Sequence, residues 1–307
     1  MRGRSTWLLL AALIGLGLVA AVDALRGGDR EPERGRGVAT TSPAADLRRA
    51  DVTGVLYFSV RSEGGCRLRA LALPGLQDAA SFDLEWCRFD VSPEGTVASG
   101  PPCAGRGGDV DVFGTPEEPP ATFAGCAPAW KPSGELTFVI DGDVQTPGGD
   151  VLVEDVAVFA RSSFPDGSRI YVREMAWLTE TRLVLVVRGT GVHPDLRDVV
   201  VLVEDGSRLS GGELNASRVH VSRRAQQIFV AHPGSGLVVY DQRGTVRSPE
   251  SRFPFGDIAA AADSPDGRWI ALARPGNVCI YEPVEPRPRE EFPVACLPFD
   301  AVDLAWG

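Results

Sequence analysis

The 307-residue sequence has no pair of cysteines in the C-x-x-C spacing, although cysteine occurs at positions 66, 87, 103, 126, 279 and 296. Because zinc sites usually draw two thiolates from within about two to four residues of each other, this spacing excludes a structural zinc site. The sequence also lacks a Gly-x-Ser-x-Gly motif, and no glycine-rich loop is followed by a helical pattern. We therefore expect neither a hydrolase nucleophile elbow nor a phosphate-binding loop.

A surplus of positive charge is missing as well. Lysine and arginine number 31, with Lys131 the single lysine, against 41 aspartates and glutamates, so the formal net charge is -10. An acidic protein repels phosphate backbones, which excludes nucleic acid as a partner. With 35 glycines and 24 prolines the chain is also too rich in turn-forming residues for a helical bundle.

The N-terminus carries an uncharged apolar stretch from Trp7 to Val22, preceded by Arg2 and Arg4. Its length lies between that of a signal-peptide core and the roughly 20 residues of a membrane span. We expect residues 1–25 to form a hydrophobic helix that acts as an uncleaved signal anchor; a signal peptide cleaved near Asp23 is the alternative. Residues 26–50 mix charge with Gly, Pro and Ser and are predicted to form a disordered tether.

Behind a secretory segment, an even number of cysteines indicates disulfides. Neighbour pairing closes loops of similar length and is the preferred connectivity: Cys66 with Cys87, Cys103 with Cys126, and Cys279 with Cys296. The alternative is six buried free thiols in a protein that stays in the cytosol.

Residues 51–307 consist of short runs rich in β-branched and aromatic residues, separated by Gly, Pro, Asp or Ser. No part of this region sustains a helical period, so the body is predicted to be all-β. The predicted strands are 55–60, 67–73, 135–140, 156–160, 169–173, 182–187, 199–204, 227–231, 237–241, 269–274 and 278–282.

One turn-centred pattern recurs along this region. Its fullest copy is Ser264-Pro265-Asp266-Gly267 followed by an apolar strand, and equivalent positions occur at residues 92, 131, 178, 222 and 264, which are 39 to 47 residues apart. Such a period is typical of a β-propeller with one four-stranded blade per repeat. The proline presets φ, and the glycine accepts the positive φ that a tight turn requires.

The last residues, 302–307, match the strand that precedes this turn in each repeat. Alone they would leave an unpaired sheet edge. The predicted strands 55–60 and 67–73, which have no opening strand of their own, are expected to complete this blade. The predicted fold is therefore a six-bladed β-propeller over residues 51–307, closed by pairing of its N- and C-terminal strands.

An aromatic residue stands just before the turn at Trp130, Trp177 and Trp306. Recurrence at one repeat position favours packing between adjacent blades; a tryptophan box for ligand stacking is the alternative.

The chain resembles the TolB-like, WD-repeat-like β-propeller family in these turns. Ser264-Pro265-Asp266-Gly267-Arg268-Trp269-Ile270-Ala271 is close to the family motif, and Ser92-Pro93-Glu94-Gly95 and Trp130-Lys131-Pro132-Ser133-Gly134 match it in part. The resemblance implies an extracytoplasmic six-bladed propeller that mediates protein contacts.

Candidate site residues are few. His193 and His232 are expected in exposed loops, whereas His220 lies in a predicted innermost strand and could face the channel. Asp141-Gly142-Asp143 and Asp109-Val110-Asp111 resemble only fragments of calcium loops, and Asn215-Ala216-Ser217 is a glycosylation triplet by pattern. We assign no catalytic residue, metal or cofactor.

These patterns predict a non-catalytic binding or scaffold protein: a monomeric, membrane-tethered propeller, or a secreted one if the N-terminus is cleaved, outside the cytoplasm. It would present loops, with 101–120 and 141–150 as candidates, to an envelope protein, peptide or glycan. The alternative is a lyase or glycoside-acting enzyme using channel carboxylates such as Asp90, Asp263 and Asp303; a close cluster would favour it, and separation by a blade each would favour binding. A sensor signalling through the membrane segment is a third possibility.

Overall fold

The computed structural model describes residues 42–104, 107–164, 166–190, 198–213, 218–222, 227–232, 236–243, 252–253, 257–282 and 293–307. The predicted N-terminal hydrophobic helix and residues 26–41 of the predicted tether lie outside these ranges. Within the described ranges, no helix has both the length and the apolar character needed to span a membrane.

Residues Ser42–Gly307 form one compact unit built from small antiparallel sheets. Four of these sheets have four strands each. In spatial order they are β23 (Ala301–Trp306), β1 (Gly54–Ser62), β2 (Gly65–Leu73) and β3 (Gln77–Leu84); β11 (Arg169–Trp177), β12 (Arg182–Thr190), β13 (Asp198–Glu204) and β14 (Ser207–Glu213); β15 (Arg218–Ser222), β16 (Gln227–His232), β17 (Gly236–Asp241) and β18 (Arg252–Phe253); and β19 (Ala260–Asp263), β20 (Ile270–Arg274), β21 (Asn277–Tyr281) and β22 (Ala295–Leu297).

The remaining strands form one seven-stranded sheet instead of the two separate blades that the repeat predicts. Its strands follow chain order: β4 (Phe89–Val91), β5 (Val97–Ser99), β6 (Gly108–Phe113), β7 (Ala121–Trp130), β8 (Leu136–Ile140), β9 (Asp143–Gln145) and β10 (Val151–Val153). The sheet is continuous because the ten-residue β7 serves two neighbours. Its first half pairs with β6 from Ala121 to Gly125, and its second half pairs with β8 from Cys126 to Trp130.

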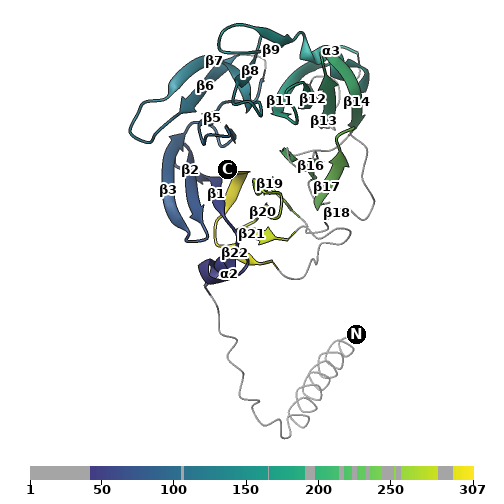
Figure 1. Ribbon diagram of the computed structural model, residues 1–307. Helices are drawn as coiled ribbons and strands as arrows, with labels where there is room; N and C mark the ends of the chain where they lie inside the picture. The colour runs from purple at the N-terminus through teal and green to yellow at the C-terminus, as the bar shows by residue number, and fades with distance from the viewer. Residues whose placement is uncertain are drawn as a thin grey trace, which may run out of the picture. The chain divides into compact units, whose positions relative to one another are not determined.

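The sheets stand around a centre in a propeller-like arrangement (Figure 1). The strands nearest the centre are β4, β7, β11, β15, β19 and β23, and each contacts the next, with β23 returning to β4. Strand β23 pairs with β1 in antiparallel register, for example Leu56 with Trp306 and Phe58 with Leu304. The predicted pairing of the first and last strands is therefore present.

The recurring turn has a common hydrogen-bond pattern. The buried Ser92 hydroxyl accepts from the backbone N–H groups of Glu94 and Thr96, and the buried Ser264 hydroxyl accepts from that of Trp269. Gly95 and Gly267 have φ of 88° and 68°, a region that favours glycine. This geometry explains why Ser, Pro and Gly recur there.

Trp177 and Trp306 pack between neighbouring sheets, as expected, whereas Trp130 packs against strands of its own seven-stranded sheet. Trp130 packs with residues of β5, β6 and β8, and Trp306 packs with residues of β1 and of the β19–β22 sheet. Trp177 packs against β7 and β8, and its indole N–H donates to Thr137 Oγ1 at 2.8 Å. Each of these three rings is buried, so none presents an exposed stacking face on the outer surface.

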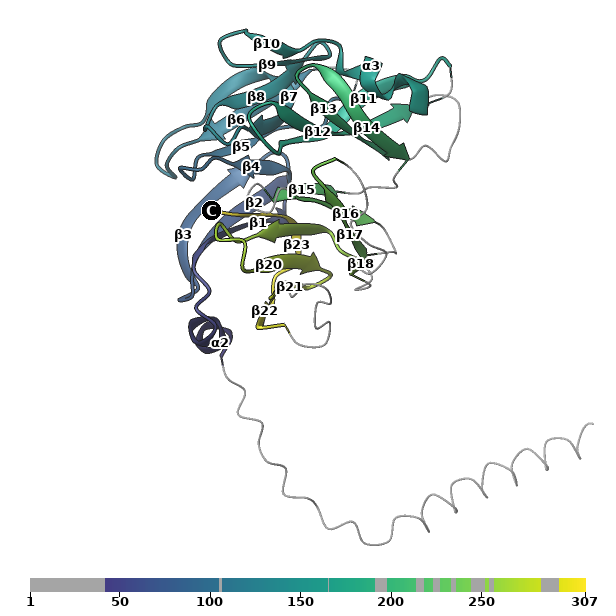
Figure 2. The same cartoon turned by 45° about the vertical axis from the view of Figure 1, so that its right-hand side comes forward.

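Two expectations about local structure are wrong. Residues 43–49, expected in the tether, form helix α2 (Pro43–Arg49), whose buried Leu47 lies in the core between β1 and the β19–β22 sheet. Figures 1 and 2 show α2 beside β22. Residues 156–160, expected as a strand, form helix α3 (Val156–Ala160), followed by the 3₁₀ turn η1 (Arg161–Ser163). Helical spacing buries Val156 and Ala160 together and leaves Val158 exposed.

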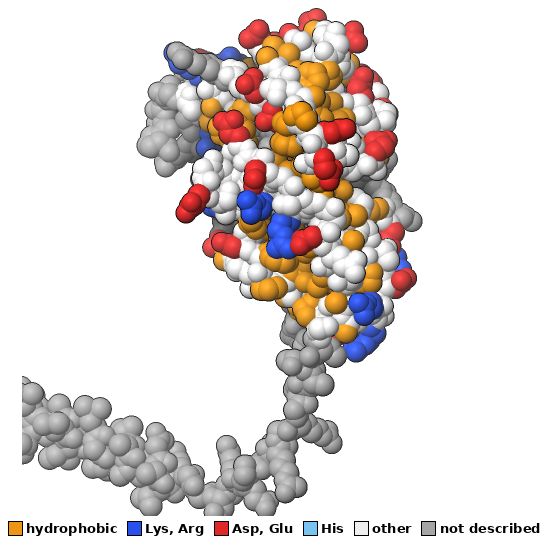
Figure 3. Space-filling view, turned by 90° about the vertical axis from the view of Figure 1, so that its left-hand side faces the viewer, with side chains coloured by type: hydrophobic (Ala, Val, Ile, Leu, Met, Phe, Trp, Pro, Cys, Tyr) orange, Lys and Arg blue, Asp and Glu red, His pale blue; other side chains and the backbone are white. Residues whose placement is uncertain are grey.

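The acidic surplus of the sequence is visible on the surface. Figure 3 looks onto the side that carries β3 and the β6–β7 hairpin and shows acidic side chains spread over it, with fewer basic ones beside them. Arg67 and Arg69 of β2 pair there with Asp83 and Asp78 of β3.

Candidate functional site: the central cavity

A cavity of about 400 Å³ lies at the centre of the sheets. Residues of β4, β7, β11, β15, β19 and β23 all line it, so it is enclosed by strands from every sheet. Its volume falls in the range of small-ligand pockets, roughly 300 to 1,000 Å³. The cavity could hold a small molecule or an extended segment of a partner, but no folded domain.

At one end of the cavity, an ion pair joins two residues of its wall. Arg88, just before β4, donates to Glu174 Oε2 of β11 at 2.8 Å and to the backbone carbonyl of Arg173 at 3.1 Å. Strand β7 lies between β4 and β11 in the circle of inner strands. The pair therefore links two inner strands that are not neighbours, and both side chains are partly buried.

Arg173 lines the same end of the cavity, and its guanidinium pairs with Asp198, which is not part of the cavity lining. The carboxylate of Asp198, only 3% exposed, receives the Arg173 guanidinium and also accepts from Arg188 Nε at 2.7 Å and Arg188 NH2 at 2.9 Å. Hydrogen bonding to Asp198 raises the pKa of Arg188 above its already high value, although burial opposes this shift. Arg188 therefore remains cationic.

The candidate carboxylates Asp90 and Asp303 join neighbouring inner strands. Asp90 Oδ2 on β4 accepts from the backbone N–H of Trp130 on β7 at 2.8 Å, and Oδ1 accepts from Val91. Asp303 on β23 likewise accepts from the backbone N–H groups of Phe89 and Leu304. Each carboxylate thus satisfies backbone donors on two strands, as a structural link between sheets does.

The third candidate, Asp263, belongs to a different cluster. Its Oδ1 lies 2.7 Å from His220 Nε2 on β15, and its Oδ2 accepts from the Ser222 hydroxyl. The backbone N–H of Asp263 lies 3.2 Å from the same imidazole nitrogen, so His220 Nε2 faces both the carboxylate and the backbone amide of Asp263. His220 lines the cavity, and Nδ1 makes no hydrogen bond among the described residues.

The three candidate carboxylates therefore stand on three different inner strands, β4, β19 and β23, each bonded to an adjacent strand. Among the residues that the structure describes, no three His, Cys, Asp or Glu side chains converge on a possible metal position.

Outcomes differ for the other predicted residues. His193 and the Asn215-Ala216-Ser217 triplet lie outside the described residues, as does the side chain of His232. The predicted loops contain strands: β6 occupies part of 101–120, and β9 occupies part of 141–150. Val110 and Phe113 are both buried, three residues apart and in two different core clusters, so they fix β6 on both faces and this segment is less free than expected.

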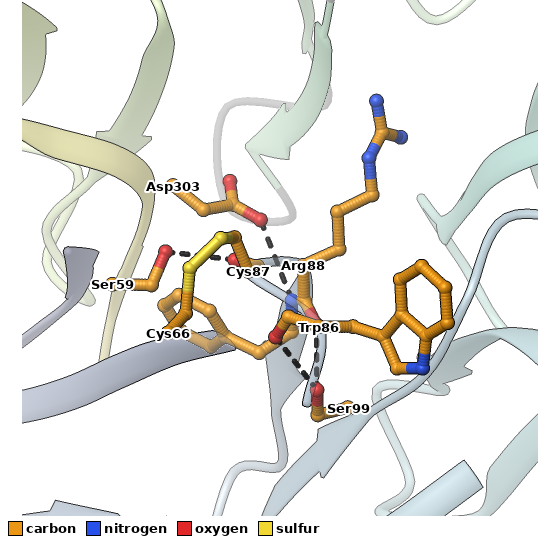
Figure 4. The surroundings of a disulfide bond; sticks show 8 residues. Ser59, Cys66, Trp86, Cys87, Arg88, Ser99 and Asp303 are labelled. Carbon is orange, nitrogen blue, oxygen red and sulfur yellow. Dashed lines mark hydrogen bonds between the residues drawn. A yellow bond between two sulfur atoms is a disulfide. The ribbon is translucent and has the colours of Figure 1, made fainter. Parts of the chain in front are cut away.

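Disulfides join Cys66 to Cys87, Cys103 to Cys126, and Cys279 to Cys296, the connectivity preferred from the sequence. The first anchors the connection between β3 and β4 (Figure 4). The second anchors β7 where its pairing passes from β6 to β8, and the third joins opposed residues of β21 and β22.

Sequence reasoning missed Arg88, Arg173 and Glu174. Arg88 and Glu174 each stand four residues before a turn position, at 92 and 178. The position four residues before the turn is the signal that the sequence offers, because it is charged in several repeats. Its residues are Arg88, Ala127, Glu174, Arg218, Ala260 and, by extension, Asp303.

Burial raises the pKa of Tyr57, which lies on β1 opposite Ala305 of β23. The phenol lies beside Gly95, at the turn after β4. Tyr57 therefore belongs to the junction between the first and last strands and not to the cavity lining.

No protein-family model matches the chain, and no curated protein matches it. Among solved structures, the chain is similar to a functionally unknown protein from Desulfotomaculum acetoxidans DSM 771, with a TM-score of 0.46 and 12% sequence identity. The match covers 83% of this chain and 99% of that chain.

Proposed function

We propose that the protein is a six-bladed propeller of the TolB-like kind in which the seven-stranded sheet counts as two blades sharing β7. Two observations support this count. Trp130 on β7 shares one core cluster with Ala98 and Val110 of β5 and β6 and with Leu136 and Phe138 of β8, so residues from both halves of the sheet pack together around β7. In addition, β4 and β7 both take places in the circle of inner strands.

We propose further that this propeller is a binding module whose ligand occupies the central cavity. The observation that carries the proposal is the central cavity of about 400 Å³ with the Arg88–Glu174 pair and His220 on its wall. A partner protein would insert a loop or an extended segment, because the space admits nothing larger.

The engagement of the carboxylates supports binding over catalysis. A carboxylate that acts as general acid or base must reach the substrate with a lone pair or proton. Asp90 and Asp303 direct both oxygens to backbone N–H groups of the inner strands. We infer that Asp90 and Asp303 fix the positions of the inner strands that form the cavity wall.

We propose that the module works outside the cytoplasm, held by the N-terminal apolar segment. The three disulfides support this location, because disulfides persist in oxidising compartments. The sequence of residues 7–22 is consistent with an anchor.

The test is a substitution that fills the cavity. Ala176 of β11 is half-buried and lines it, so Ala176→Phe should occlude the space, whereas Ala79→Phe on exposed β3 adds the same ring elsewhere. We expect a partner or small ligand captured from an extract of the source cells by residues 42–307 to be retained by Ala79→Phe and lost by Ala176→Phe. Equal capture by both variants would contradict a cavity site.

A second candidate function is supported by His220 and Asp263. A histidine on the wall of a cavity, held by a carboxylate at 2.7 Å, has a geometry suited to a general base. The Ser222 hydroxyl donates to Asp263 Oδ2, so its proton is directed to the carboxylate, and the base would act on water or a substrate hydroxyl.

Measuring whether a substrate is turned over distinguishes the enzyme proposal from the binding proposal. Under the enzyme proposal, hydrolysis or elimination of a peptide or oligosaccharide library should fall at least about 100-fold in His220→Gln. Under the binding proposal no turnover occurs, and the ligand is released unchanged.

A further inference from the structure

Trp86 differs from the other tryptophans that the structure describes. Trp130, Trp177, Trp269 and Trp306 are buried between sheets, whereas Trp86 is 38% exposed. Among the described residues its indole stacks on no other ring or cation, and its N–H makes no hydrogen bond. A single exposed apolar side chain is ordinary on a protein surface, so exposure alone indicates nothing.

The backbone around Trp86 is unusually well fixed, however. The Ser99 hydroxyl lies within hydrogen-bond distance of the carbonyls of both Trp86 and Arg88, at 3.1 and 2.9 Å. The Ser59 hydroxyl donates to the carbonyl of Cys87 at 2.7 Å, and Cys87 is joined to Cys66. Ser59 and Ser99 are buried, so these contacts are shielded from water. Three consecutive residues of a connection between strands are thus immobilised.

The fixed segment also presents Arg88. Figure 4 shows the Trp86 indole and the Arg88 side chain projecting to the same side of the segment, away from the disulfide. Arg88 lines the central cavity and meets Glu174 there. Trp86 stands two residues before Arg88 on this fixed segment, so an aromatic face lies beside the end of the cavity where a planar cationic donor meets a carboxylate acceptor.

We propose that Trp86, Arg88 and Glu174 form a binding site for a neutral sugar ring at this end of the cavity. The C–H face of a pyranose is flat and apolar and packs on an indole, whose π face is electron-rich. Sugar hydroxyls both donate and accept, so they match a guanidinium and a carboxylate that already share one hydrogen bond. The proposal deepens the proposed binding function and rests on it for the use of this end of the cavity.

The surroundings favour a sugar over other ligands. A nucleotide or phosphate would meet an acidic protein, of net charge -10, and the nearby Glu174, Asp198 and Asp303. A docked protein normally buries several large apolar side chains at the core of its interface. The exposed large hydrophobic residues in the described ranges are only Trp86, Val151 and Val158. A neutral ligand that needs one aromatic face fits the surface better.

The rigidity of the segment that carries Trp86 and Arg88 also suits a sugar ligand. Sugars bind weakly per unit area, because their hydroxyls exchange one hydrogen-bond partner for another. A site that is already ordered loses little conformational entropy on binding. The disulfide and the two buried serines supply that order for Trp86 and Arg88.

The test uses the full chain and soluble oligosaccharides built from glucose, galactose, mannose or N-acetylglucosamine, with binding followed by tryptophan fluorescence and calorimetry. We expect at least one of these probes to bind. Trp86→Ala should weaken it about tenfold or more, a loss of about 1.4 kcal/mol. Trp86→Phe keeps an aromatic face and should weaken it less. Val158→Ala, at another exposed hydrophobic residue, should leave the affinity unchanged.

Failure to bind any of the sugars overturns the proposal, and so does binding that Trp86→Ala leaves intact. The cavity-filling variant separates this result from the broader one. If no sugar binds but a partner is captured by Ala79→Phe and lost by Ala176→Phe, the sugar site falls and the cavity function stands. If sugars bind through Trp86 while Ala176→Phe loses no ligand, the sugar site stands on its own.

Discussion

Asp198 shows how a buried charge is stabilised in this protein. Its carboxylate, at the start of β13, is 3% exposed and receives the guanidinium groups of Arg173 and Arg188. Removing a carboxylate from water costs several kcal/mol, which only close, well-aligned cations offset. The arrangement also fixes Arg173 on the wall of the cavity, so stability and site geometry depend on the same residue.

Replacing Asp198 with Asn should lower the free energy of unfolding by about 2 to 4 kcal/mol, because two partly buried guanidinium groups lose their counter-ion. Denaturant unfolding measures the change. The control is Asp83→Asn, which removes an exposed ion pair with Arg67 and should cost less than about 1 kcal/mol. Equal losses in the two variants would show that burial does not govern the energy of these pairs.

Tyr57 gives a pH dependence of known sign. Burial raises the pKa of Tyr57, so the folded state keeps the phenol proton more tightly than the unfolded state does. The stability from this difference is complete below the unfolded pKa of about 10 and is lost as pH rises through the folded pKa. Wild-type protein should lose stability more steeply between about pH 9 and 11 than Tyr57→Phe. Parallel curves in denaturant titrations would exclude the effect.

At the scale of elements, α2 extends the folded unit beyond the predicted boundary at residue 51. Ser42 caps the helix by accepting from the backbone N–H of Ala45, and Pro43 follows at the first helical position. The helix lasts only seven residues, too short to be stable alone. Packing of Leu47 into the core therefore has to stabilise it.

Leu47→Ala should destabilise the unit by about 2 to 5 kcal/mol, as loss of a fully buried leucine does. Arg48→Ala changes the exposed neighbour on the same helix and should shift the unfolding free energy by less than about 0.5 kcal/mol. Thermal or denaturant unfolding checks both variants. A neutral Leu47→Ala would support the tether that the composition of residues 26–50 predicts.

The two wrong predictions of local structure, at residues 43–49 and 156–160, have the same cause. The sequence of residues 43–49 has one apolar anchor, Leu47, and residues 156–160 form a five-residue apolar run that suits strand and helix alike. Short segments of this kind take their structure from tertiary packing, which local propensity does not encode. The long runs such as 182–187 and 199–204 were predicted correctly because residues of both faces are buried there, which favours a β-branched continuous run.

At the scale of the whole molecule, recurrence of the turn predicted the propeller-like arrangement and the pairing of β1 with β23. It did not predict the shared β7, because a single ten-residue strand pairs with β6 through its first half and with β8 through its second half, with no turn to separate two sheets. It also missed the Arg88–Glu174 pair, whose partners are 86 positions apart and come from inner strands that are not neighbours. Repeats determine which strands are central, whereas contacts across the centre depend on side chains that differ between repeats.

The circle of sheets is closed at the junction between β1 and β23. Trp306 lies in the core shared by β1, β23 and the β19–β22 sheet, and its indole N–H donates to the carbonyl of Thr53 at 3.1 Å. The backbone N–H and carbonyl of Val55 bond to those of Gly307. The junction is therefore held by a buried ring as well as by strand pairing.

Trp306→Ala should cost about 3 to 5 kcal/mol, as truncation of a buried aromatic does, while Trp86→Ala at the exposed site should cost less than about 1 kcal/mol. If the strands at the junction are the last step of closure, hydrogen exchange in Trp306→Ala should accelerate first in β1 and β23 and only later in β12 and β13. Uniform acceleration through all sheets would show instead that the circle opens only with global unfolding, because no single junction is weaker than the others.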